Sequence, residues 1–248
     1  MERIIVHGIV LSEIDYKESS KILNIFTLEY GNIGVLSKGS KKLKSNLRSI
    51  SNKLNYCEFT ISYKENGLST LIEGNTINSF KFINSDFKAQ LYSMYLIDLT
   101  KEILKDNVDF NYKDLYYLLV NSLEKINDKF NPEFIVSIFE LKLLRYLGIE
   151  LELNNCISCG STDIKTIDIN LGGLVCKDCY NDTYLFTKNT IKLIRQMYYI
   201  DLSKLESIDI PDGYLDEIDK FIDEYYETYT GLYRKNKNNI KRMLSSFT

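Results

Sequence analysis

Four of the five cysteines in the chain form two CxxC pairs, Cys156 with Cys159 and Cys176 with Cys179. Two residues between cysteines allow both sulfur atoms of a tight knuckle to reach one ion, and two knuckles complete a tetrahedron. Four thiolates in that geometry select zinc. Because four protein ligands leave no coordination position for water or substrate, we expect one structural Zn²⁺ per chain rather than a catalytic one.

The residues around these cysteines also fit a zinc ribbon. Gly160 directly follows the first pair and supplies the permissive backbone that a knuckle needs. The intervening segment DIKTIDINLGGLV alternates like a β-hairpin with its turn at Gly172 and Gly173. Disulfide pairing is the alternative, although a reducing compartment disfavours it. The fifth cysteine, Cys57, falls in a predicted strand, where we expect it to act as a small buried hydrophobe.

A basic segment, SKGSKKLKSNLR at residues 37–48, stands out in a chain with a net charge of −3 and a pI of about 5.4. No aspartate or glutamate occurs from residue 30 to residue 57. Such a segment could cradle a nucleotide, contact a polyanion or form an ordinary solvated loop. The order of Ser40 and Lys41 argues against a nucleotide-binding Walker A loop, in which the lysine must come first. The other two interpretations remain open.

If the basic segment contacts a polyanion, its cations neutralise phosphates and release counterions. Such contacts hold a strand without reading its bases, which stay available for pairing. The candidate nucleic-acid-binding cations are Lys38, Lys41, Lys42, Lys44, Arg48, Lys53 and Arg3. Tyr16 lies in the predicted connection between the first two strands and is the candidate for base stacking, although the sequence favours an ordinary surface tyrosine somewhat over this role.

No set of catalytic residues emerges from the sequence. His7, the single histidine, falls in the first predicted strand with no carboxylate or cysteine close to it in sequence, so we interpret it as structural. The acidic segment at residues 214–229 places apolar residues on an inward helical face, and Asp216 and Lys220 form an (i, i+4) pair. We therefore interpret its acids as a solvated face rather than a metal or acid/base site, and we expect no enzymatic activity.

The elements that position these residues change character near residue 80. Residues 1–80 contain five short β-branched segments, the last two joined at Asn66 and Gly67, a strong hairpin signal. Five such strands predict a closed barrel of the OB-fold type, with the basic segment after the third strand, where OB-folds often carry a helix. From residue 81 the apolar period becomes helical. The expected helix N-caps are Ser85, Asn111, Asn131 and Thr187.

The predicted fold is multi-domain α+β. It consists of an OB-fold nucleic-acid-binding domain at 1–80, a helical domain that begins at 81–150, a four-cysteine zinc ribbon inserted at 151–185, and the rest of the helical domain at 186–248. The helix that starts at Asn131 and Pro132 should end near Gly148. No segment is apolar enough to span a bilayer and no signal peptide is evident, so we expect a cytoplasmic protein.

In its order of parts the chain resembles the bacterial recombination mediators of the RecO family. The resemblance rests on residues 15–42, DYKESSKILNIFTLEYGNIGVLSKGSKK, with the family's basic signature at Ser37, Lys38 and Gly39. It also rests on residues 139–160, FELKLLRYLGIELELNNCISCG, where a leucine-rich helix runs into the first CxxC pair. The resemblance covers most of the chain and is expected to fade after about residue 190. The acidic helix and the basic tail at 234–242 therefore carry no family assignment.

The resemblance implies a protein that binds single- and double-stranded DNA and anneals complementary strands. It further implies a partner, RecR, with which such a protein loads the RecA recombinase onto DNA coated by the single-strand-binding protein SSB. The acidic tail of SSB is a second implied partner, and a nucleoid-associated location follows. Neither a membrane nor a small-molecule substrate is implied. A competing hypothesis is a docking scaffold whose basic surfaces bind acidic peptides of partner proteins instead of DNA.

Overall fold

A computed structural model describes residues 2–105, 111–207, 213–230 and 235–246, with the side chains of residues 235 and 236 excepted. The chain divides into two compact units, Met1–Asp128 and Lys129–Thr248. The first contains all the strands of a barrel, and the second contains the cysteine quartet. In the described ranges no helix is both long and apolar enough to cross a membrane.

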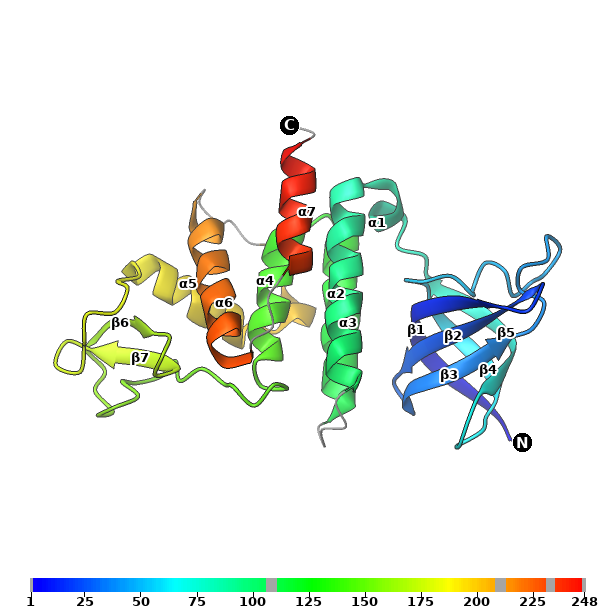
Figure 1. Cartoon of the computed structure of the whole chain (residues 1–248), viewed down its shortest axis with the longest axis horizontal. Helices are drawn as coiled ribbons and strands as arrows, with labels where there is room; N and C mark the ends of the chain where they lie inside the picture. Colours follow the sequence, from blue (N-terminus) through cyan, green and yellow to red (C-terminus); the bar gives the residue numbers. More distant parts are fainter. Residues whose placement is uncertain (1, 106–110, 208–212, 231–234, 247–248) are drawn as a thin grey trace. The chain divides into compact units, whose positions relative to one another are not determined.

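Five strands close into a barrel in the order β1-β2-β3-β5-β4 (Figure 1). The β3–β5 pair is parallel and the other pairs are antiparallel. Apolar side chains alternate inward along the strands, so that Val6, Val10, Leu23 and Ile25 belong to one buried core. This confirms the predicted five-stranded barrel. The strands are β1 (Arg3–Tyr16), β2 (Ser20–Thr27), β3 (Gly31–Ser37), β4 (Tyr56–Ser62) and β5 (Ser69–Asn78).

The predicted hairpin at Asn66 and Gly67 is confirmed, because β4 and β5 pair antiparallel across this connection. Gly67 has φ +124°, a conformation that side chains rarely adopt. A second glycine serves packing inside the barrel. A Cβ added at Gly8 of β1 would lie 2.6 Å from the Ile25 side chain of β2 and 2.9 Å from the Phe26 carbonyl oxygen. The strands can approach this closely only with glycine at that position.

Three helices complete the first unit: α1 (Lys81–Ser85), α2 (Phe87–Lys105) and α3 (Tyr112–Asn127). The compact unit therefore extends past residue 80, where the sequence predicted a domain boundary. The rings of Phe26 and Tyr116 meet edge to face at 5.6 Å, and the Tyr112 hydroxyl donates to the Glu29 carbonyl at 2.9 Å. These contacts join α3 to the end of β2 and the turn after it.

The N-caps of these helices agree with the sequence in one case and differ in the other. The Asn111 side chain accepts a hydrogen bond from the Lys113 amide, as predicted. The prediction of Ser85 as a cap is wrong, because Ser85 ends α1. The Asp86 carboxylate caps α2 by accepting from the Ala89 amide at 2.7 Å. The short helix α1 was not anticipated from its apolar pattern.

The second unit is built around α4 (Pro132–Leu143), which is buried along nearly its whole length. The caps at Asn131 and Thr187 are both confirmed. The helix ends at Leu143, earlier than predicted, and the chain leaves it through turns that include Gly148 at φ +70°. The other elements are β6 (Ile164–Asp168), β7 (Gly173–Cys176), α5 (Lys188–Tyr199), the short 3₁₀ helix η1 (Leu202–Lys204), α6 (Tyr214–Thr230) and α7 (Lys235–Ser245).

Helix α7 changes the interpretation of the acidic helix α6. Asp219 was expected to face solvent, but it is 5% exposed and forms ion pairs with Lys237 and Lys241 of α7. The solvated-face interpretation is wrong at this residue, because a later helix packs over it. Within the described ranges Lys220 pairs with Glu224 at 3.9 Å rather than with Asp216 as predicted.

Candidate metal centre and nucleic-acid interface

The four predicted zinc ligands come together in one cluster. The Sγ atoms of Cys156, Cys159, Cys176 and Cys179 all lie within 4.8 Å of one another, and the Cys159–Cys176 pair is at 3.6 Å. A tetrahedron with Zn–S bonds of about 2.3 Å has sulfur–sulfur separations of about 3.8 Å. The cluster therefore fits one four-coordinate ion. All five cysteines are free thiols in the structure, which does not support the disulfide alternative.

Local backbone geometry forms the first knuckle. The Gly160 amide donates to the Cys156 carbonyl at 2.8 Å, and Gly160 has φ +76°, as its position after the CxxC pair predicted. The Ile157 amide donates to the Leu174 carbonyl of β7 at 2.8 Å, which joins this knuckle to the hairpin. Backbone hydrogen bonding from Cys176 lowers the pKa of Cys156 to about 6. The thiolate, which is the form that binds metal, is favoured there.

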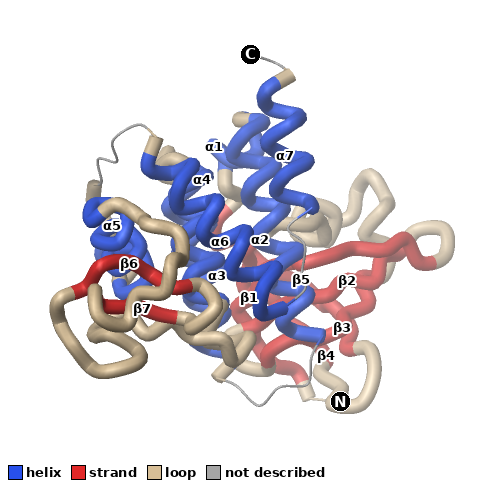
Figure 2. Tube along the Cα trace, turned by 60° about the vertical axis from the view of Figure 1, so that its left-hand side comes forward, coloured by secondary structure: helices blue, strands red, loops and turns tan. Residues whose placement is uncertain are grey.

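The hairpin between the two knuckles is held by its turn and by α6. Gly172 lies in the turn at φ +74°, as predicted, whereas Gly173, which was also expected in the turn, already begins β7. The Tyr229 hydroxyl of α6 donates to the Asn170 carbonyl at 2.8 Å, so the ribbon is docked on this helix. Figure 2 shows that much of the ribbon around β6 and β7 is loop. A segment with so little regular structure is of the kind that a bound metal ion stabilises.

The basic segment connects β3 to β4 through turns, and its described residues form no helix. Buried serines fix it to the barrel: the Ser37 and Ser51 hydroxyls are 2.8 Å apart, and the Ser40 hydroxyl donates to the Ser37 carbonyl. Ile50 inserts into the barrel core. The segment is therefore an ordered rim of the barrel, and its cations have defined positions.

The structure divides the predicted cations into two groups. Lys41 binds the Asp15 carboxylate at 2.6 Å, and Lys53 pairs with Asp98 of α2 at 3.3 Å. The hydrogen bond from Lys41 lowers the pKa of Asp15, so this acid stays charged. The remaining cations of the segment are exposed and form no ion pair with any residue in the described ranges. These unpaired cations are Lys38, Lys42, Lys44 and Arg48.

A hollow of about 410 Å³ lies beside these cations, between the β1–β2 turn and the end of β3. We call it the barrel groove. The residues that line it include Tyr16, Lys17, Ser20, Lys38, Gly39 and Lys42. The Gly39 amide donates to the Ser20 hydroxyl at 3.1 Å, and the Lys41 amide donates to the Ser19 carbonyl at 2.9 Å. These bonds hold the basic segment against the turn and bring the candidate stacking residue to two candidate cations.

The structure adds one cation to the barrel groove and places one of the predicted cations outside it. Lys17, which was not among the predicted cations, also lines the groove, with its amine 5.4 Å from the Tyr16 ring centroid. Arg3 was among the predicted nucleic-acid-binding cations, but it is the first residue of β1, whereas Tyr16 is the last. At about 3.3 Å per residue the two ends of β1 are roughly 40 Å apart along the strand. Arg3 is exposed but does not belong to the barrel groove.

His7 has carboxylate partners that are distant in sequence. Its Nδ1 atom lies 2.7 Å from Glu29, and its Nε2 atom lies 3.5 Å from Glu58. The sequence offered no such partners, because Glu29 follows β2 and Glu58 lies on β4. Among the residues that the structure describes, the cysteine quartet is the only cluster whose atoms converge as metal ligands would.

The structure defines a protein with an N-terminal five-stranded barrel of the OB type, a cationic groove at its rim, and later helices that accompany a four-cysteine ribbon. Residues 1–80 match the family described as Recombination protein O N terminal, and residues 84–238 match Recombination protein O C terminal. The chain therefore belongs to the RecO family. The matched region reaches residue 238, so the expectation that the resemblance fades after about residue 190 is wrong, and α6 lies inside the family region.

Individual relatives agree with the family match. The DNA repair protein RecO of Halalkalibacterium halodurans is 33% identical over 96% of this chain and 94% of the relative. The corresponding Bacillus subtilis protein is 34% identical over the same shares. A protein of this name from Listeria monocytogenes is 33% identical over 95% of this chain and 93% of its own length. The similarity therefore extends through both compact units.

Proposed function

We propose that this chain acts in DNA repair as a recombination mediator that binds single- and double-stranded DNA and anneals complementary strands. The observation that carries the proposal is the barrel groove, where Tyr16 lies with Lys38 and Lys42 at the rim of an OB-type barrel. The relatives that carry the name DNA repair protein RecO support the role in repair. The mechanism is binding without covalent chemistry, and the protein is not an enzyme in this proposal.

The unpaired cations suit annealing because they act on the strand's backbone. Lys38, Lys42, Lys44 and Arg48 contact phosphates, release counterions and lower the repulsion between two strands. Phosphate contacts carry no sequence information, so the base edges remain available to test a complement. Tyr16, with 36% of its surface exposed, stacks on one base and holds the strand in register.

The cysteine quartet holds one structural Zn²⁺ in this proposal. Cys156, Cys159, Cys176 and Cys179 supply all four ligands, and the ion stabilises the ribbon and its contact with α6. Zinc therefore contributes to the fold of the second unit. The chemistry at the barrel groove does not involve it.

The wider pathway role rests on family membership. The chain works with RecR to load RecA onto single-stranded DNA coated by SSB, and it binds the acidic tail of SSB. Such a protein acts in the cytoplasm, associated with the nucleoid. These partners are macromolecules, and the proposal includes no membrane and no small-molecule substrate.

A docking scaffold for acidic peptides is the second candidate function. One contact favours it: the basic segment already holds a carboxylate, because Lys41 binds Asp15 at 2.6 Å. An acidic partner could present its carboxylates to the neighbouring unpaired lysines in the same way. The two candidates differ in whether DNA or an acidic peptide binds these lysines more strongly.

A pair of matched double variants tests both functions. Lys38→Ala/Lys42→Ala removes two unpaired lysines from the barrel groove, and Lys41→Ala/Lys53→Ala removes two lysines that are already paired with acids. Each phosphate contact on a single strand contributes about 0.7 to the slope of log affinity against log salt, so the first variant should lower the slope by about 1.4. At physiological salt this corresponds to about tenfold weaker binding of an oligothymidine.

The control variant Lys41→Ala/Lys53→Ala should lose much less affinity for the oligothymidine than Lys38→Ala/Lys42→Ala does. An acidic peptide is titrated in parallel under the same salt conditions. Equal losses for the two double variants would disprove the groove assignment. A loss confined to the acidic peptide would favour the docking function over DNA binding.

A further inference from the structure

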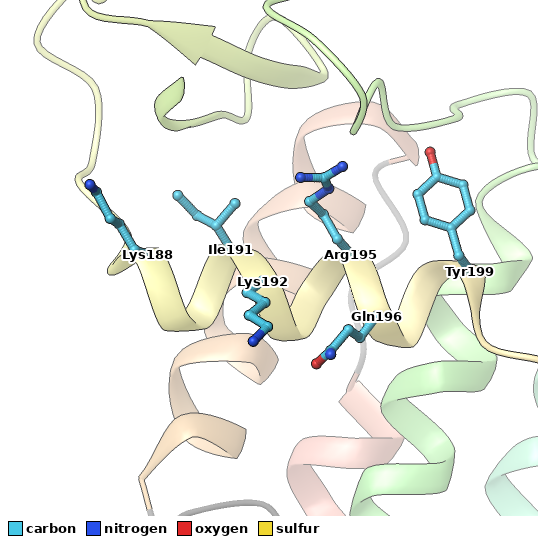
Figure 3. Close-up of a pocket in the computed structure, with 6 residues that line it drawn as sticks. All are labelled: Lys188, Ile191, Lys192, Arg195, Gln196 and Tyr199. Carbon is cyan, nitrogen blue, oxygen red and sulfur yellow. The ribbon is translucent and has the colours of Figure 1, made fainter. Parts of the chain in front are cut away.

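Helix α5 presents a second row of cations that the proposed function does not use. Lys188, Lys192 and Arg195 follow one another at helical spacing and are exposed. They line a hollow of about 400 Å³, which we call the α5 groove (Figure 3). Its lining residues are Lys188, Ile191, Lys192, Arg195, Gln196 and Tyr199. All six come from this one helix, so the groove runs along its length.

The charges of this row have no acidic partner in the described ranges. No residue of α5 is an Asp or a Glu, and none of the three cations takes part in an ion pair there. By contrast, other lysines of the second unit do pair with acids: Lys204 with Asp201 at 3.2 Å, and Lys220 with Glu224 at 3.9 Å. The α5 groove is therefore a local positive surface in an acidic protein, and it is available to an anion.

An exposed aromatic ring lies at the end of the row of cations on α5. Tyr199, with 53% of its surface exposed, lies at the C-terminal end of α5. Its ring meets that of Tyr198 edge to face at 5.1 Å. The Tyr198 carbonyl accepts a hydrogen bond from Lys142 of α4 at 2.9 Å, which fixes the backbone beneath the ring. The groove thus combines cations with an anchored aromatic platform, the two elements that bind single strands.

We infer that the α5 groove is a second binding site for single-stranded nucleic acid, with Lys188, Lys192 and Arg195 on phosphates and Tyr199 stacked on a base. The row from Lys188 to Tyr199 is about 16 Å long at 1.5 Å per residue. Since phosphates along one strand of a duplex are about 3.4 Å apart along the axis, this length fits roughly three to five nucleotides. The Gln196 amide lies beside the row and can hydrogen-bond to a base edge.

The lining favours a nucleic acid over an acidic peptide. A peptide that binds in a groove is usually held by apolar side chains in pockets. Here Ile191 is the one aliphatic residue of the lining, and it is 7% exposed, so it offers little surface to such an anchor. The accessible lining is cationic, amide and aromatic, which suits phosphates and bases.

The biological role of this second site rests on the proposed function, because a second strand-binding site would serve the annealing of two strands. If one protein chain holds one DNA strand in the barrel groove and a second DNA strand in the α5 groove, each strand has a raised local concentration around the other. The α5 groove is nevertheless testable by itself.

The experiment uses the full-length chain and two oligothymidines that cannot pair, one labelled with a donor and one with an acceptor dye. Energy transfer reports that one chain holds both strands. Lys192→Ala/Arg195→Ala should weaken the second binding event about tenfold, reduce the energy transfer accordingly and lower the salt slope of that event by about 1.4. The control Lys204→Ala/Lys220→Ala removes two lysines already paired with acids and should retain the transfer.

The stacking role has its own pair of variants. Tyr199→Ala should weaken the second binding event at least fivefold, whereas Tyr199→Phe keeps the ring and should bind as the unchanged chain does. Thermal melting of each variant verifies that it is folded. If a folded Lys192→Ala/Arg195→Ala variant keeps both oligothymidines and loses only a glutamate-rich peptide, the groove is a peptide site and the inference is overturned. Unchanged binding of both probes overturns it as well.

The same assay separates this inference from the proposed function. Lys38→Ala/Lys42→Ala should weaken strand binding at the barrel groove about tenfold and leave the α5 groove active. If that variant has no effect while Lys192→Ala/Arg195→Ala does, the barrel assignment fails and the α5 groove stands. If only the barrel variant has an effect, the α5 groove is refuted and the proposed function is untouched.

Discussion

Removing the Lys237 amine should destabilise the second unit more than removing the Lys241 amine of the same helix. Lys237 is 1% exposed and lies 2.7 Å from the Glu140 carboxylate of α4, and it also binds Asp219 of α6. It therefore connects three helices through charge in a buried site. Apolar packing contributes little to holding α7, because Ile240 is the one buried apolar side chain among the described residues of this helix.

The size of the effect follows from burial. Removing one partner of a buried ion pair typically costs about 3–5 kcal/mol, because the remaining charge loses its compensation. Lys237→Met keeps most of the side-chain volume and removes the amine, so we expect a loss in this range. At about 2–4 °C per kcal/mol for a chain of this size, the melting temperature of the second unit should fall by roughly 10 °C.

Lys241→Met is the matched control in the same helix. Lys241 also binds Asp219, but its side chain is 34% exposed and Lys237 remains beside the acid. Solvent screening limits such a pair to about 1 kcal/mol, which corresponds to about 3 °C. Differential scanning calorimetry measures both variants, and limited trypsin digestion reports whether α7 detaches. Equal shifts for the two variants would refute the argument that the Lys237 pairs are stronger because they are buried.

Three further predictions concern the thiols and the half-buried Lys142. Metal analysis should find one zinc per chain, and a strong chelator should lower the melting temperature of the second unit. The control variant Cys57→Ser should leave the zinc content unchanged. A zinc-free protein of equal stability would contradict the ligand assignment. Burial raises the pKa of Cys57 to about 11, so this thiol should react with iodoacetamide at pH 8 at least tenfold more slowly than in the unfolded chain. Desolvation lowers the pKa of Lys142 to about 8 from an ordinary value of 10.5, so the unfolded chain binds more protons between these pH values and stability should be lost as pH falls through them. Lys142→Met should flatten that part of the pH profile and raise the melting temperature at pH 7; an unchanged pH profile would show that the amine is well solvated.

Local signals were sufficient wherever neighbouring residues alone set the geometry. Side-chain caps at Asn111, Asn131 and Thr187 form as predicted, because a cap bonds an amide only two or three residues away. Gly160 and Gly172 adopt positive φ because a knuckle and a hairpin turn require it. The Ser85 prediction failed on the same local scale, since Asp86 competes for the cap one residue later.

Long-range pairing decided the state of individual charges. Lys41 and Lys42 are adjacent and identical in type, yet Lys41 forms an ion pair with Asp15 of β1, and Lys42 lines the barrel groove. Asp219 looks like a solvated acid in its own helix, and only the return of α7 buries it. The spacing of charges along a helix does not show which face a distant segment will cover.

The sequence by itself determined the barrel, the helical character of the rest and the four cysteines that converge in one cluster. These features depend on period, propensity and spacing, which act over a few residues. Only the tertiary structure decided which cations are unpaired, that Tyr16 meets Lys38 and Lys42, and that Arg3 lies elsewhere. Electrostatic pairing and burial depend on residues brought together from distant parts of the chain, so the closure of the barrel and the packing of the helices determine where a polyanion can bind.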